Sequence, residues 1–231
     1  MSGSNGFWEQ PDVVEAFATR APDHRLLELI ETYDDPASVR VLDIGCAGGR
    51  NTVLLAERGF DVHALDTSRA MVAETRRRVA AVLGEEEAEA RVREGRMDDL
   101  SRFEDGDFDL VISLGVLHNA RSWDEWQRAV AESARVLRPG GRLLVAQFSP
   151  ETDLTGEGVR PVPGEPHLYE GLPAGRTTLL EPAVLDEEME RHGLVPEVPT
   201  TTGRTISGDT RRVSVNALYR KQGGGAGHPR A

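Results

Sequence analysis

Residues 39–51 read Val-Arg-Val-Leu-Asp-Ile-Gly-Cys-Ala-Gly-Gly-Arg-Asn. The apolar run 39–44 predicts a buried strand, and the glycines after it predict a sharp turn into a helix that begins near Arg50. Glycine lets a backbone approach a ligand closely, and the first N–H groups of the following helix point at that ligand. Asp43 places a carboxylate at the end of the strand, beside the same pocket. This combination is typical of an enzyme that binds a nucleoside-containing cofactor.

Composition narrows the class of protein. The chain has 231 residues, enough for one α/β domain with a substantial core, and its formal net charge of -12 disfavours a surface that binds nucleic acid nonspecifically. Its single cysteine, Cys46, forms neither an intramolecular disulfide nor a cysteine metal cluster, and we predict no metal site. The first residues lack the pattern of a signal peptide, and no apolar run approaches the ~18 residues that cross a bilayer. We therefore expect a soluble cytoplasmic protein without a membrane partner.

Strand and helix patterns alternate along most of the chain. Apolar runs predict strands at 39–44, 60–65, 90–94, 108–114 and 142–148, and helical patterns separate most of them. Two further strands, near 194–200 and 212–219, flank a turn around 202–209 and would pair antiparallel. The alternation predicts an α/β fold, a single three-layer domain with a mostly parallel, seven-stranded sheet that ends in an antiparallel hairpin.

The segments outside this alternation have their own composition. Residues 1–38 carry helical spacings and predict a helical cap that belongs to the same domain, whose main part is 39–221. Residues 149–178 are rich in proline and glycine and predict a long loop, which we expect to serve as a lid over the active site. The glycine-rich tail 222–231 is predicted to be disordered.

Acidic residues stand at or just after the ends of three consecutive predicted strands. They are Asp43, Asp66 and Asp98. Asp66 lies about twenty residues after the glycine turn, the spacing at which a carboxylate grips ribose hydroxyls in dinucleotide-binding folds. Taken alone, this arrangement fits NAD as well as other nucleoside cofactors.

The order of elements and motifs resembles the class I S-adenosylmethionine-dependent methyltransferases over residues 39–219. The resemblance is carried by Val-Leu-Asp-Ile-Gly-Cys-Ala-Gly-Gly-Arg at 41–50, Asp66, Gly-Arg-Met-Asp at 95–98, Phe-Asp-Leu-Val-Ile-Ser-Leu at 108–114 and Leu-Arg-Pro-Gly-Gly-Arg-Leu-Leu at 137–144. It implies the Rossmann-like methyltransferase fold, with S-adenosyl-L-methionine as cofactor.

The resemblance also implies the cofactor contacts. Asp43 and the turn 45–49 would hold the methionine moiety, Asp66 the ribose, and Asp98 with the Met97 backbone the adenine amine. The full set implied to contact the cofactor is Asp43, Gly45, Cys46, Ala47, Gly48, Gly49, Asn51, Asp66, Thr67, Met71, Met97, Asp98, Leu114 and Gly115. Ala47 departs from the family pattern, which usually has glycine there. The added methyl group fits easily only if φ at Ala47 is negative.

Methyl transfer from a sulfonium is an in-line displacement, which requires an aligned acceptor and sometimes a base. His118 follows the fourth predicted strand and is a candidate base, although it would equally serve to shape the pocket. Tyr169 is a second candidate catalytic residue, because it would orient the nucleophile. Candidate substrate contacts are His118, Arg160, His167, Tyr169 and Arg176, with Phe7, Trp8 and Phe17 as an apolar wall over the substrate.

A small-molecule acceptor is the favoured substrate class. A weaker likeness to the tellurite-resistance and thiopurine branch rests on Trp8 and on residues 11–15, 49–51 and 55–62, and the quinone and sterol carbon-methylating branches remain open. An RNA or protein substrate is disfavoured by the acidic balance. The Asn/Asp-Pro-Pro-Tyr type of signature, which is typical of family members that methylate amines and bases, is also missing. Its place after the fourth predicted strand is taken by Ser-Leu-Gly-Val at 113–116. A non-catalytic S-adenosylmethionine-binding module and an NAD-dependent oxidoreductase are the alternatives.

Overall fold

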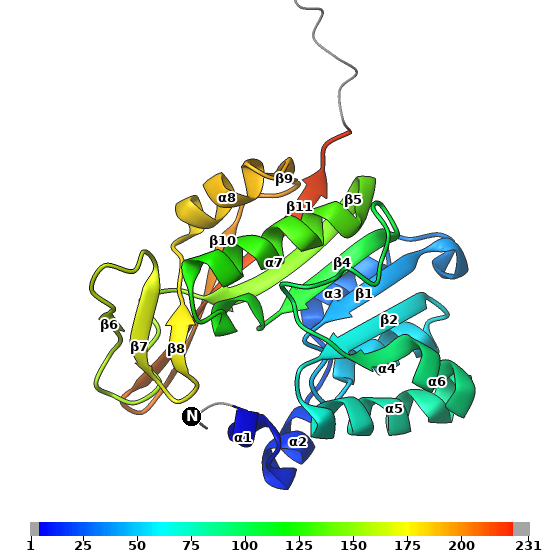
Figure 1. Ribbon diagram of the computed structural model, residues 1–231, viewed down its shortest axis with the longest axis horizontal. Coiled ribbons are helices and arrows are strands. Elements are labelled where there is room, and N and C mark those ends of the chain that lie inside the picture. Colours follow the sequence, from blue (N-terminus) through cyan, green and yellow to red (C-terminus); the bar gives the residue numbers. More distant parts are fainter. Residues whose placement is uncertain (1–4, 224–231) are drawn as a thin grey trace, which may run out of the picture.

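A mixed sheet forms the centre of the computed structural model, which describes residues 5–223 (Figure 1). Its strands lie in the order β10-β11-β5-β4-β1-β2-β3, and the short β9 pairs with β11 as the eighth strand. The strands are β1 (Arg40–Ile44), β2 (Asp61–Asp66), β3 (Val92–Glu94), β4 (Phe108–Leu114), β5 (Leu137–Phe148), β9 (Leu194–Pro196), β10 (Thr201–Ser207) and β11 (Thr210–Lys221). From β5 to β3 all neighbours are parallel, whereas β11 runs antiparallel to β5, β9 and β10. The predicted Rossmann-like methyltransferase fold is confirmed, with one strand more than expected.

Helices cover both faces of this sheet. They are α1 (Asn5–Trp8), α2 (Pro11–Ala18), α3 (His24–Ile30), α4 (Arg50–Glu57), α5 (Arg69–Leu83), α6 (Glu85–Arg91), α7 (Trp123–Val136) and α8 (Pro182–Glu190). Alternate residues of the central strands face opposite sides. Val41 packs with α3 and α4, while its neighbour Leu42 packs with α7 and α8. This period of two puts an apolar core on each face, which makes the three predicted layers.

Side-chain caps fix where several helices begin. The Ser68 hydroxyl accepts the N–H of Met71 at the start of α5, and the Ser122 hydroxyl accepts the N–H of Glu125 at the start of α7. Within residues 5–223, no helix combines the length and the hydropathy that crossing a membrane requires.

The segment 149–178 is not the loop that its composition predicts. It contains β6 (Arg160–Pro161), β7 (Leu168–Leu172) and β8 (Gly175–Thr178), which form a separate antiparallel sheet beside the main one (Figure 1). Its strands are two to five residues long, too short to give a visible apolar period. Buried side chains such as Leu168 and Leu172 nevertheless anchor this small sheet.

The C-terminal hairpin is longer than predicted. The expected turn 202–209 mostly belongs to β10, and the chain reverses instead at Gly208 and Asp209. β10 escapes sequence analysis because nearly all of its side chains are exposed, so that no apolar side alternates with a polar one. Of the tail predicted to be disordered, residues 224–231 lie outside the described part of the chain.

Candidate active site

The turn between β1 and α4 is held open by backbone geometry that glycine permits. Gly45 has φ of 70°, and its N–H and that of Cys46 donate to the carbonyl of Leu65 at 2.8 and 3.0 Å. A Cβ atom at Gly45 would lie 2.6 Å from the Val116 side chain, closer than atoms can approach. The turn therefore lies tightly between β2 and the loop after β4, and this position needs glycine for both its φ and its space.

Ala47 takes the conformation that suits it least. Its φ is 48°, in the left-handed region, rather than the negative value that would accommodate its methyl group easily. Such a conformation costs a non-glycine residue about 1–2 kcal/mol. Two hydrogen bonds hold it there, because the Ala47 N–H donates to Asp66 Oδ2 at 2.9 Å and the Thr75 hydroxyl donates to the Ala47 carbonyl at 2.6 Å. The turn is thus a strained segment that its surroundings impose.

Asp66 lies at the end of β2 and fixes this turn. Its second carboxylate oxygen accepts the N–H of Ser68 at 2.9 Å. Burial raises the pKa of Asp66, and the N–H donors of Ser68 and Ala47 oppose that rise. Each carboxylate oxygen keeps a free lone pair, so the group can still accept two hydroxyl donors.

Asp98 is held by two arginines. Its Oδ1 accepts Nε of Arg96 at 2.9 Å and its Oδ2 accepts a guanidinium nitrogen of Arg128 at 3.1 Å. Burial favours a raised pKa of Asp98, but the hydrogen bonds from both arginines outweigh it and lower the pKa. Arg96 also donates a hydrogen bond to Glu125 at 2.8 Å, which connects the loop after β3 to the start of α7. Asp98 is therefore an ionised carboxylate held within an ion-pair network.

These groups surround a cavity of about 1190 Å³ at the carboxyl ends of β1, β2 and β4. The predicted cofactor residues that line it are Gly45, Cys46, Ala47, Asn51, Asp66, Thr67, Met71, Met97, Asp98, Leu114 and Gly115. Sites of this size and position bind nucleotide-like ligands in doubly wound folds. The remaining three predicted residues, Asp43, Gly48 and Gly49, do not line the cavity.

Asp43 supports the turn from beneath. Its side chain is 2% exposed and accepts the Thr52 hydroxyl of α4 at 2.6 Å. Burial raises the pKa of Asp43 to about 6, and the nearby Thr52 and Arg50 oppose that rise. Because the carboxylate does not line the cavity, Asp43 would affect the binding of a ligand by fixing the position of α4.

Gly48 and Gly49 are packing positions. A Cβ atom at Gly48 would lie 2.6 Å from the backbone of Ala18 in α2, and one at Gly49 would lie 2.9 Å from the Thr75 side chain. The Arg78 guanidinium donates to the carbonyls of both Ala18 and Gly48, at 2.9 and 2.6 Å. Gly48 therefore lets α2 dock closely on the turn, and Gly49 does the same for α5.

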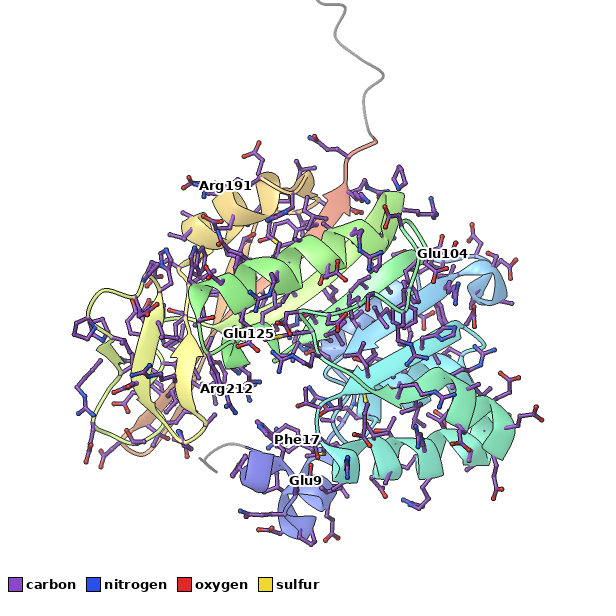
Figure 2. The ribbon with its side chains drawn as sticks, viewed as in Figure 1. Glu9, Phe17, Glu104, Glu125, Arg191 and Arg212 are labelled. Carbon is purple, nitrogen blue, oxygen red and sulfur yellow. The ribbon has the colours of Figure 1, made fainter. Side chains whose placement is uncertain are left out.

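Further cavity residues come from the N-terminal cap and from α7. Trp8 and Phe17, expected from the sequence to form an apolar wall over the substrate, line the cavity with rings in edge-to-face contact at 5.3 Å. The Ser68 hydroxyl donates to the Trp8 carbonyl at 3.0 Å, which fastens the cap to α5. Glu125 reaches the cavity from the first turn of α7. Its ion pair with Arg96 joins residues that are far apart in the sequence, so no local sequence pattern indicates it. Figure 2 shows Phe17 and Glu125 on opposite sides of the opening.

His118 lies in a second, smaller cavity next to the first. Its side chain is 6% exposed and its ring stacks on Phe148 at 4.1 Å. Burial lowers the pKa of His118 to about 3, and the charge of Arg212 lowers it further. The imidazole is therefore neutral and weakly basic at neutral pH. Its role as a general base stays a prediction, and the low pKa favours the pocket-shaping alternative.

The other predicted substrate residues lie outside both cavities. Arg160 and Arg176 are exposed on the small sheet, where Arg176 pairs with Glu170 at 2.9 Å. His167 packs on Trp123 at 4.7 Å, and Tyr169 is half-buried in β7. Ala174, in the turn between β7 and β8, is the residue through which the small sheet borders the large cavity. The substrate and catalytic roles of these side chains, and the lid role of 149–178, stay predictions without structural support.

Neither a reactive thiol nor a metal site appears in this region. Cys46 is buried, and burial raises the pKa of its thiol well above the usual value, which disfavours thiolate chemistry. In the part of the chain that the structure describes, no group of three histidine, cysteine, aspartate or glutamate side chains is placed to bind a metal ion.

Comparison with known proteins agrees with this geometry. Residues 42–145 match the family described as "Methyltransferase domain". The matched segment runs from β1 to β5 and contains the glycine turn, Asp66 and Asp98.

Two curated relatives each align with about half of the chain. Demethylmenaquinone methyltransferase from Beutenbergia cavernae is 40% identical over 116 residues, which is 48% of this chain and 41% of that protein. Ribosomal RNA small subunit methyltransferase C from Chromohalobacter salexigens is 35% identical over 126 residues, or 52% of this chain and 35% of that protein. The chain thus spans less than half the length of these relatives, and their acceptors differ in kind.

A solved structure extends the likeness to nearly the whole chain. It is the 1,6-didemethyltoxoflavin-N1-methyltransferase of Burkholderia thailandensis with bound 1,6-didemethyltoxoflavin and S-adenosylhomocysteine. It superposes with a TM-score of 0.57 at 20% identity and covers 96% of this chain and 92% of its own. At this identity, the likeness establishes the common fold.

Proposed function

We propose that this chain, a class I S-adenosylmethionine-dependent methyltransferase by its fold and its matched domain, transfers a methyl group to a small-molecule acceptor by in-line displacement. The observation that carries the proposal is the position of Asp66. Its carboxylate lies at the end of β2, lines a cavity of about 1190 Å³, and accepts the backbone of the positive-φ turn that follows β1.

The residues present fit the cofactor in chemistry and order. Asp66 has free lone pairs for two ribose hydroxyls, and Met97 with Asp98 lies one strand farther along, where an adenine amine would find acceptors. The turn at Gly45 and the residues Leu114 and Gly115 would face the methionine part. S-adenosylmethionine supplies an electrophilic methyl group on its sulfonium. In this proposal Arg96 and Arg128 keep Asp98 ionised and therefore acceptor-only.

The chain's own contribution is alignment and exclusion of water. Catalysis of a displacement gains from holding the reacting atoms ~3–3.5 Å apart in a fixed orientation. The cap formed by α1 and α2 covers the cavity with Trp8 and Phe17, and it is fastened to the start of α5 by Ser68 and by Glu9, which accepts the N–H groups of Arg69 and Ala70. His118, neutral and close to Gly115, would shape the acceptor side.

A small molecule is the proposed acceptor class. The net charge of -12 opposes the phosphate contacts that RNA binding depends on. The names of the relatives include both a quinone precursor and a ribosomal RNA, so the matched domain alone leaves the choice open. The cytoplasmic location expected from the sequence stays a prediction.

Transfer of a labelled methyl group tests the proposal. The protein would be incubated with S-adenosylmethionine that carries a ¹³C-methyl group, together with tellurite, selenite, thiols, phenols, quinols and amines, and products including the headspace would be followed by mass spectrometry. We expect label on one chemical class and equimolar S-adenosylhomocysteine. Tight binding of S-adenosylhomocysteine without transfer to any acceptor would contradict catalysis and favour the non-catalytic binding module.

A further inference from the structure

The smaller cavity, which has a volume of about 50 Å³, lies on the acceptor side of the proposed cofactor site. It shares Arg50, Leu114 and Gly115 with the large cavity, so the two are separated by one layer of residues. Its other walls come from His118, from the end of β5, from the first half of β11 and from the start of α3. A group bound there would lie beside the cofactor and outside the cavity that is proposed to hold the cofactor.

The lining of this smaller cavity is positively charged. It contains Arg25, Arg50 and Arg212, and within residues 5–223 its only acidic residue is Asp23. Arg25 grips the Asp23 carboxylate with Nε at 2.9 Å and a terminal nitrogen at 2.5 Å, so these two charges neutralise each other. In the described part of the chain, neither of the other two arginines has a carboxylate within the 4.0 Å of an ion pair, and Asp43 and Asp23 act on them only from a greater distance. In a chain of net charge -12 this local excess requires an explanation.

Arg212 is placed by the antiparallel pairing of β11 with β5. Ser214 pairs with Phe148, and the Arg212 guanidinium consequently lies over the Phe148 ring at 5.2 Å. The side chain is exposed, but it lies in a recess, and Figure 2 shows it facing the opening from the side opposite Phe17. Partial burial and the charges of Arg20, Arg50 and Arg25 lower the pKa of Arg212. Mutual repulsion of this kind is relieved when an anion binds between the guanidinium groups.

We infer that this smaller cavity binds an anionic group of the methyl acceptor, a carboxylate or a phosphate, through Arg212 and Arg50. The inference rests on the proposed function and narrows its substrate class to small oxyanions. Guanidinium groups suit this task because their planar N–H pairs match two oxygens of a carboxylate or phosphate. Anchoring that end of the acceptor would present its nucleophile toward Gly115 and the cofactor site.

The cofactor's own carboxylate is the competing occupant. Arg212 does not line the large cavity, whereas Arg50 lines both. We therefore assign Arg212 to the acceptor, and binding of S-adenosylhomocysteine should not depend on it.

Anion-induced thermal stabilisation tests this assignment. The melting temperature would be measured with saturating S-adenosylhomocysteine at constant ionic strength, with sodium chloride replaced stepwise by sodium phosphate or sodium acetate. The variants are Arg212→Gln, Arg212→Lys and, as the matched control, Arg211→Gln. Arg211 is the neighbouring residue, lines neither cavity, and donates to the Glu151 carbonyl instead. Affinity for S-adenosylhomocysteine would be measured by calorimetry for each variant, and melting in chloride alone reports folding.

We expect phosphate or acetate to raise the melting temperature of the wild type and of Arg211→Gln. In Arg212→Gln this increase should be less than half as large as in the wild type. Arg212→Lys should keep part of the increase. The anion with the larger effect identifies the group as a phosphate or a carboxylate. An equal rise in Arg212→Gln, or none in the wild type, would overturn the inference. A tenfold loss of S-adenosylhomocysteine affinity in Arg212→Gln would assign the arginine to the cofactor and also overturn it. If the wild type binds no S-adenosylhomocysteine, the proposed function fails, while the anion effect is still scored by the difference between variants.

Discussion

The carboxylate of Asp66 accepts the backbone N–H of Ala47 at 2.9 Å and holds that residue at φ of 48°. The acid at the end of β2 therefore shapes the turn after β1 as well as facing the cavity. Turn and acid form one unit, in which the ligand-facing group also maintains the strain of the loop beside it.

Replacing Ala47 with glycine removes this strain. The left-handed conformation costs alanine about 1–2 kcal/mol in the folded state. Glycine avoids this cost, but its greater conformational freedom stabilises the unfolded chain by about 0.4–1 kcal/mol and offsets part of the gain. We expect Ala47→Gly to raise the free energy of unfolding by roughly 0.5–1 kcal/mol, measured by urea denaturation. The reverse substitution Gly59→Ala, at φ of 81° with no atom within 4 Å of the new methyl group, is the control and should be destabilising. Destabilisation by Ala47→Gly would show that its methyl contacts outweigh the strain.

Loss of the Asp66 carboxylate should weaken cofactor binding. Hydrogen bonds to a charged group contribute ~1.5–3 kcal/mol, so Asp66→Ala should lower affinity for S-adenosylhomocysteine by about 10- to 150-fold. The ligand-induced shift in melting temperature measures it. Asp61→Asn changes an acid at the opposite end of β2, where it pairs with Arg91, and should keep the wild-type response. An unchanged response in Asp66→Ala would refute the ribose role.

Asp43 makes stability fall as pH rises. Its pKa of about 6 in the folded protein exceeds the usual 3.8, so between these values the folded state binds more protons than the unfolded state. This contribution is fully present below pH 3.8 and is lost as pH rises through 6. Asn keeps an acceptor for the Thr52 hydroxyl without the buried charge. We expect the stability of Asp43→Asn relative to wild type to increase by about 2 kcal/mol from pH 4 to pH 7. A difference that stays constant over this range would contradict the burial of a titrating carboxylate.

The titration of His118 changes the stability of the fold with pH in the opposite direction. Its pKa of about 3 lies below the usual 6.5, so the unfolded state binds the proton first and stability falls as the solution is acidified below 6.5. From pH 7 to pH 5 the histidine should cost the wild type on the order of 2 kcal/mol, and His118→Gln should not lose it. Urea unfolding at both pH values provides the comparison. Equal losses in wild type and variant would mean that the imidazole is protonated in the folded protein.

The features that sequence analysis located are those encoded within a short stretch. The apolar runs of β1 and β4, the glycine turn, and Asp66 at its spacing all lie where local pattern placed them, because each strand is buried on both sides and each turn needs glycine. Asp43 shows the limit, since its position at the strand end is as predicted while its side chain faces Thr52 rather than the cavity.

The features that were missed depend on tertiary pairing. Arg212 reaches the site only through the register of β11 on β5, and Arg128 reaches Asp98 from 30 residues away. The small sheet of β6, β7 and β8 is assembled from strands too short to show a period. Its side chains Arg176 and Tyr169, which look suited to a substrate in sequence, lie outside both cavities.

Calorimetric titration of the wild-type protein with S-adenosylhomocysteine, and separately with NADH, tests the central claim most directly. Both ligands carry an adenosine that Asp66 would hold, but the turn beside Gly45 and the region of Leu114 are proposed to accept a methionine chain rather than a second nucleotide. We predict binding of S-adenosylhomocysteine at micromolar or tighter affinity and no comparable heat with NADH. Binding of NADH without binding of S-adenosylhomocysteine would contradict the account and identify an oxidoreductase.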